Sequence, residues 1–162
     1  MDAATSLPRI GIVAGAIGFG VTALSLVALD FATGRPAFFT AALLGGVLLD
    51  GTGSSPTVTI ALLPVLAYAG LHLTVYIAIG LLGAWLARIA EGGRQLWFVG
   101  LVVFIIVSFH VIGAVQLLAV PADASIAGTR GWVSGILSGL AMTAYLLRMH
   151  PNVRRMMRTW EE

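Results

Sequence analysis

The sequence predicts an all-α membrane protein: a bundle of four transmembrane helices with a short outer helix and a C-terminal surface helix. Of its 162 residues, 59% are hydrophobic and 10% are charged, and the mean hydropathy is +0.99. Soluble domains carry about 25% charged residues, and a domain of this size still exposes roughly a third of its chain surface. So much apolar surface requires lipid as its solvent. The composition therefore excludes a soluble enzyme, a disordered chain and a nucleic-acid partner.

Four apolar runs are long enough for the roughly 20 residues that cross a bilayer. The predicted spans are 10–30, 64–88, 95–120 and 128–148, within a single transmembrane domain of residues 1–162. Each must be helical, because lipid offers no partner to a free backbone N–H or C=O. Pro64 lacks a backbone donor, so we expect it to start or kink the second span.

Two shorter helices are expected outside the spans. Residues 36–49 are apolar, but about 14 residues are too few to cross, so this segment is either interfacial or re-entrant. Pro36 suits a helix start, and the Gly45-Gly46 pair suits a break. Residues 151–161 are amphipathic, which predicts a helix on the inner leaflet. Its membrane-surface residues are Arg154, Arg155, Arg158 and Trp160.

The distribution of arginine predicts the orientation. With four spans, both termini lie on one side, and the side richer in arginine faces the cytoplasm. We therefore expect a multi-pass protein of the bacterial inner membrane with both termini cytoplasmic. The inner side holds Arg9, Arg88, Arg94, Arg148, Arg154, Arg155 and Arg158, and the outer side holds Arg35 and Arg130.

Glycine marks the helix faces that are expected to pack closely. Span four has glycine at every fourth position, and span one has a similar pair. Such spacing lets another helix backbone approach. The first and fourth spans are expected to pack together this way, with a homo-oligomer or a larger membrane complex as the alternative. The helix-packing residues are Gly11, Gly15, Gly131, Gly135 and Gly139.

Two histidines lie within the spans. His72 precedes Arg88, and His110 follows Arg94, by equal numbers of residues. At about 1.5 Å per residue, both rings lie roughly 24 Å from the inner interface. Tyr68 and Tyr76 flank His72 at i−4 and i+4 on one helix face. These four residues form the candidate cofactor-binding site. The histidines are either hydrogen-bonding groups between helices or axial ligands of a b-type haem, and the cofactor is otherwise unknown.

The sequence contains no catalytic constellation. Cysteine is absent, which excludes disulfides, thiolate metal sites and thiol nucleophiles. No Asp or Glu lies within a span away from its ends, which disfavours carboxylate-driven transport and carboxylate-bridged metal sites. Two imidazoles are too few for zinc. We therefore predict no metal site and no catalytic residues, which favours a protein that is not an enzyme.

The segment from Gly34-Arg35-Pro36 through Phe39-Thr40 to Leu43-Leu44-Gly45 resembles one found in small, uncharacterised bacterial membrane proteins with four spans. Tyr68 and His72 are also similar to that group. The resemblance implies the topology and no activity. It also draws attention to Arg35, which could face the outer mouth of the bundle above His72. A snorkelling interfacial arginine is the alternative.

Three functions remain open. The first is an accessory or scaffold protein that packs through its glycine faces. The second is a haem-binding electron-transfer subunit, or a quinone-associated one, that uses His72 and His110. The third is a small permease.

Overall fold

The computed structural model describes residues 6–50, 59–91, 102, 105–107, 109–110, 113 and 124–151. All secondary structure in these residues is helical. The main helices are α1 (Leu7–Ala32), α2 (Phe39–Asp50), α3 (Leu62–Ala90) and α5 (Ala124–Met149). Residues 102, 105–107, 109–110 and 113 are also helical. The all-α class is thus confirmed. Most of the predicted span 95–120 and the predicted surface helix 151–161 lie outside the described residues, including Arg154, Arg155, Arg158 and Trp160.

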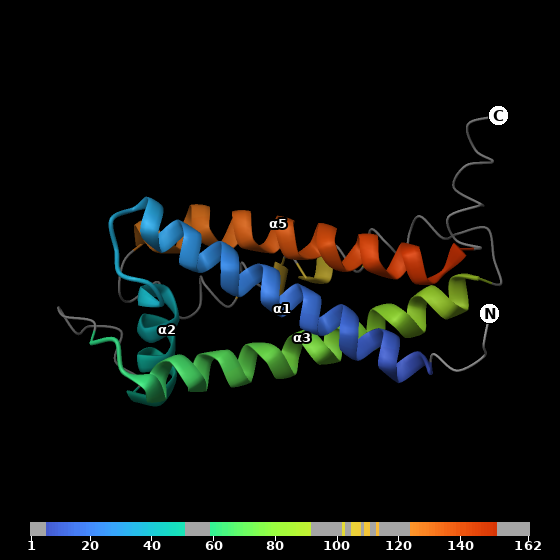
Figure 1. Cartoon of the computed structure of the whole chain (residues 1–162), viewed down its shortest axis with the longest axis horizontal. Coiled ribbons are helices and arrows are strands. Elements are labelled where there is room, and N and C mark those ends of the chain that lie inside the picture. The colour runs from blue at the N-terminus through green and yellow to red at the C-terminus, as the bar shows by residue number, and fades with distance from the viewer. Residues whose placement is uncertain are drawn as a thin grey trace.

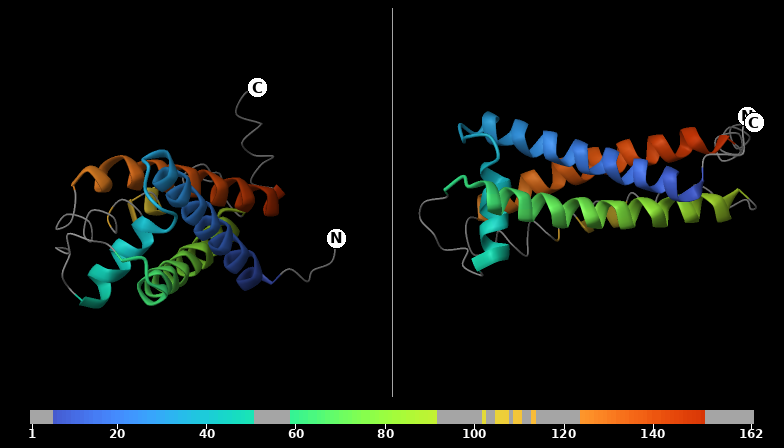
Figure 2. Two further views of the ribbon diagram at one scale, coloured as in Figure 1. Left: turned by 60° about the vertical axis from the view of Figure 1, so that its left-hand side comes forward. Right: turned by 60° about the horizontal axis from the view of Figure 1, so that its bottom comes forward.

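Three long helices run along a common direction, and α2 lies across them at one end (Figures 1 and 2). α1 crosses α3 and lies beside α5, and it is antiparallel to both. α3 and α5 are parallel, because both begin at the end covered by α2 (Figure 1). The described arginines divide accordingly. Arg9, Arg88 and Arg148 lie near the far ends of their helices, whereas Arg35 and Arg130 lie near the end covered by α2.

Two helices, α1 and α3, are long and apolar enough to cross a membrane by length and composition. Only 28% of each apolar window is buried within the chain, which is unlike the core helix of a soluble protein. Large apolar side chains such as Leu24, Leu62 and Leu63 are instead 69–74% exposed. These two helices are therefore candidate membrane spans.

The start of α2 differs from the predicted start at Pro36. The chain turns after α1 at Gly34, whose φ is +72°, and again at Phe38, whose φ is +65°. The helix begins at Phe39 because the carboxylate of Asp30 accepts a hydrogen bond from the Thr40 amide at 2.9 Å. A carboxylate there satisfies a free N–H and complements the helix dipole.

The predicted break at Gly45-Gly46 is also wrong, because α2 continues through both residues to Asp50. Gly45 lies directly against the backbone carbonyl of Pro64, where a Cβ atom would overlap it. This glycine serves close packing of α2 on α3 rather than a turn. Pro64 itself lies in the first turn of α3, where a missing N–H disturbs no helical hydrogen bond.

The first and fourth spans pack together as expected, but Gly11 and Gly15 of α1 pack against α3 rather than against α5. A Cβ atom on Gly15 would lie 2.5 Å from the Tyr76 carbonyl oxygen. A Cβ atom on Gly80 of α3 would overlap the backbone of Gly11. The α1–α5 contact instead includes Gly18, which lies against Met142. Gly131, Gly135 and Gly139 of α5 are buried within the chain.

We predict that Gly80→Ala destabilises the protein by about 1–3 kcal/mol, because the added methyl group forces α1 and α3 apart. The matched control is Gly70→Ala on the same helix, where a Cβ atom meets nothing within 4 Å. Thermal unfolding in detergent, followed by circular dichroism, measures both. Equal midpoints for the two variants would contradict the close contact.

Candidate functional site

A buried ion pair joins three helices at the end covered by α2. Nη1 of Arg130 donates to Oδ1 of Asp30 at 2.9 Å and to Oγ1 of Thr40 at 2.7 Å. The Thr40 hydroxyl donates to the same carboxylate oxygen at 2.6 Å. Nη2 of Arg130 donates to Oγ1 of Thr33 at 2.6 Å. Asp30 and Thr40 are 0% exposed and Arg130 is 4% exposed, so the pair is almost fully desolvated.

The sequence placed Asp30 and Arg130 on the outer side, but it did not predict their contact. The sequence predicts only that Arg130 lies on the outer side, and the structure shows that it is buried there. The signal that could have indicated the ion pair is that Asp30 and Arg130 carry opposite charges and both fall at the outer ends of predicted spans. A buried ion pair requires such close hydrogen bonding, because desolvation of each charge costs several kcal/mol.

Tyr76 lies at the centre of a hydrogen-bonded chain between helices. Its hydroxyl is 2.5 Å from Oγ1 of Thr22 on α1 and donates to Oγ of Ser138 on α5 at 3.0 Å. Ser138 in turn donates to the carbonyl of Gly135 at 3.1 Å. The Tyr76 side chain is fully buried. These hydrogen bonds connect α1, α3 and α5 through polar side chains. Neither Thr22 nor Ser138 is assigned to the site from the sequence.

The four predicted site residues lie together. Tyr68 and His72 stack with ring centroids 4.2 Å apart, and Tyr68 Oη is 3.2 Å from His72 Nε2. The His72 and His110 rings are 5.4 Å apart between centroids. Tyr76 meets His110 edge-on at 6.1 Å. Nε2 of His110 is buried and has no hydrogen-bond partner among the described residues. The equal depth predicted for the two histidines thus corresponds to contact between them.

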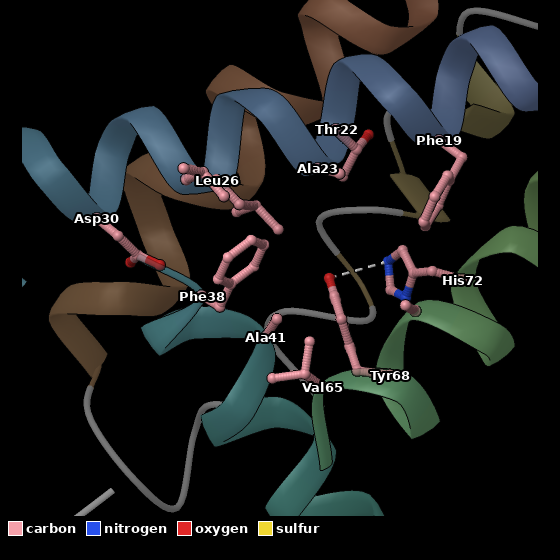
Figure 3. Close-up of a pocket in the computed structure, with 12 residues that line it drawn as sticks. Phe19, Thr22, Ala23, Leu26, Asp30, Phe38, Ala41, Val65, Tyr68 and His72 are labelled. Atoms are coloured by element: carbon pink, nitrogen blue, oxygen red, sulfur yellow. Dashed lines mark hydrogen bonds between the residues drawn. The ribbon is translucent and has the colours of Figure 1, made fainter. Parts of the chain in front are cut away.

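A cavity of about 140 Å³ lies beside this cluster, between α1, α3 and the start of α2. Figure 3 shows the rings of Phe19, Phe38 and Tyr68 around it, with His72 at one end and Asp30 at the other. The remaining wall comes mainly from α1 and α3 and is aliphatic apart from Thr22, whose hydroxyl contacts Tyr76. No sequence pattern indicates this cavity, because its wall combines single side chains from separate elements.

Arg35 lies apart from the histidines. Its guanidinium stacks on the Phe39 ring at 4.6 Å from the ring centroid, and it is not among the described residues that line the cavity. A second polar contact closes the opposite end of the bundle, where Nδ1 of His150 lies 3.0 Å from Oε1 of Glu91. It joins the ends of α3 and α5.

Within the described residues, no group of three or more His, Cys, Asp or Glu side chains is placed to hold a metal ion. The cluster and the cavity beside it present hydrogen-bonding groups and an apolar wall.

Comparisons of the chain with protein-family models, with curated proteins and with solved structures find no match. The resemblance to small four-span bacterial membrane proteins therefore stays a prediction.

We predict that Arg130→Met destabilises the protein by about 3–5 kcal/mol, because it leaves the buried carboxylate of Asp30 without its counter-ion. Arg148→Met is the matched control, since it removes an exposed arginine from the same helix. Chemical unfolding in detergent measures both. The double variant Asp30→Asn, Arg130→Met should recover part of the loss. Equal stability of the two single variants would show that the ion pair does not hold these helices.

Proposed function

We propose that this chain is an integral membrane protein of four spans that binds a small apolar molecule in the cavity between α1, α2 and α3. The cavity is the observation that carries the proposal. Ligand sites are concave and mostly apolar, with a few polar groups that orient the ligand. Here the wall is aromatic and aliphatic apart from four polar residues. Tyr68 and His72 bond to each other, while Asp30 is paired with Arg130 and Thr22 with Tyr76.

The membrane topology rests on three observations. α1 and α3 expose apolar surface along their length. α3 and α5 are parallel (Figure 1), as an antiparallel third span between them in the sequence would require. The sequence assigns seven arginines to the side of the two termini and two to the other side, which favours a cytoplasmic location of both termini by the positive-inside rule. The proposed location is the bacterial inner membrane, with residues 95–120 as the third span and residues 151–161 as the surface helix.

An accessory or scaffold role also stays a prediction, as does a small permease. The argument from glycine is weaker than the sequence indicated. Gly11 and Gly15 contact α3 of the same chain, and the glycines of α5 are buried within it. These faces are occupied inside the protein, so they no longer favour a second copy or a larger complex over internal packing.

Haem binding is a second candidate, and the contact between His72 and His110 favours it. A haem iron between two imidazoles requires one nitrogen of each ring to face the metal. His72 Nε2 is instead 3.2 Å from Tyr68 Oη, and Tyr76 lies against both histidine rings. A macrocycle would therefore have to displace both tyrosines. The apolar ligand needs no such rearrangement, so we favour it.

We predict that Ala69→Leu removes the natural ligand, because the larger side chain enters the cavity that Ala69 lines. The matched control is Ala78→Leu, which is exposed on the same helix. Mass spectrometry of organic extracts should find a molecule that copurifies with the wild type and with Ala78→Leu but is depleted in Ala69→Leu. Identical extracts from all three proteins would contradict the proposed function.

The haem alternative predicts a sharp reduced absorption band when the purified protein is mixed with haem and treated with dithionite. His72→Ala and His110→Ala should each abolish that band, because each removes an axial ligand. The optical spectrum measures this directly. A featureless spectrum of the wild-type protein would exclude the haem function and leave the apolar-ligand function intact.

A further inference from the structure

The cavity has room for about one ring of a ligand. A dry engineered cavity of about 150 Å³ lined by aliphatic and aromatic side chains holds one benzene molecule. The present cavity, at about 140 Å³, is of the same size. Three aromatic side chains from different elements surround it: Phe19 on α1, Phe38 before α2 and Tyr68 on α3 (Figure 3). Aromatic walls favour a flat ring through offset or edge-to-face contacts.

The polar pair on the wall favours a ligand that accepts a hydrogen bond. Tyr68 Oη and His72 Nε2 share one hydrogen bond at 3.2 Å. When the histidine nitrogen carries the proton and donates, the tyrosine hydroxyl keeps its own hydrogen for a third group. A ligand oxygen at this point completes a chain from His72 through Tyr68 to the ligand.

The charges around the cavity favour a neutral ligand. Among the described residues that line it there is no arginine or lysine, so a carboxylate or phosphate would be buried without a counter-ion. Asp30 lines the far end of the cavity, and both of its carboxylate oxygens already accept hydrogen bonds from Arg130 or Thr40. A cationic ligand would have to compete with Arg130 for that carboxylate.

We infer that the ligand presents an uncharged six-membered ring with a carbonyl oxygen, as in a quinone or an aromatic ketone. The ring lies between Phe19, Phe38 and Tyr68, and its oxygen accepts a hydrogen bond from the Tyr68 hydroxyl. This inference rests on the proposed function, because it names the class of molecule that the same cavity takes.

The experiment compares four small probes on the full chain in lipid nanodiscs by equilibrium dialysis, with protein-free nanodiscs to subtract partition into lipid. The probes are 2,5-dimethyl-1,4-benzoquinone, p-xylene, n-hexane and benzoate. The first two share the same methylated ring and differ in the carbonyl oxygens. The chain contains no cysteine, so it offers no thiol to which the quinone could add.

We expect the quinone to bind most tightly and benzoate not to bind. Tyr68→Phe keeps the ring and removes the hydroxyl, so it should weaken quinone binding by about threefold to tenfold and leave p-xylene unchanged. Ala69→Leu should abolish binding of both ring compounds, and Ala78→Leu should not. Far-ultraviolet circular dichroism of each variant confirms that it is folded.

The outcomes separate the two proposals. Equal binding of quinone and p-xylene, unaffected by Tyr68→Phe but lost in Ala69→Leu, would overturn the carbonyl assignment and support the apolar site. Tighter binding of n-hexane than of p-xylene would overturn the inference that the ligand contains a ring. Binding of benzoate would overturn the inference that the ligand is uncharged. If Ala69→Leu changes the binding of none of the probes, the cavity is not a ligand site and both proposals fail.

Discussion

The ion pair between Asp30 and Arg130 determines the architecture of the end of the protein that contains the cavity. The Asp30 carboxylate lies at the end of α1 and caps the first turn of α2. It also accepts a hydrogen bond from Arg130 of α5. Either charge alone would be costly in so buried a place, and the two are stabilised together by the hydroxyls of Thr33 and Thr40. The position of α2 follows from this contact, and so does the placement of Phe38 in the cavity wall.

The polar side chains of α3 divide into two kinds. Tyr76 has two hydroxyl partners on neighbouring helices, which leaves its oxygen satisfied and makes it a structural contact between α1, α3 and α5. Tyr68 and His72 bond only to each other among the described residues, and they line the cavity. A ligand oxygen gains most binding free energy at a buried group that can still donate a hydrogen bond, because no existing hydrogen bond has to be broken.

Local patterns predicted the helices well, whereas the contacts between them depend on rotations that the sequence does not specify. The observed α1 and α3 begin and end within a few residues of the predicted 10–30 and 64–88. Depth along a helix follows from residue number, which is why His72 and His110 could be placed at one level. Burial of Arg130 and the packing of Gly15 on α3 require knowledge of which face meets which neighbour. The carboxylate cap on α2 likewise comes from ten residues earlier in the chain, beyond any capping motif of α2 itself.

The apolar character of the cavity explains why its few polar groups matter. A buried water molecule needs two to four polar partners. Both carboxylate oxygens of Asp30 are engaged by Arg130 and Thr40. The Tyr68 hydroxyl, bonded to His72, keeps one hydrogen to donate, so the wall offers water too few partners. A molecule that supplies apolar surface for Phe19, Phe38 and Leu26 and a single oxygen for Tyr68 is better matched to this wall. The ion pair therefore contributes to selectivity without touching the ligand, because it neutralises the one carboxylate that would otherwise attract water or a cation.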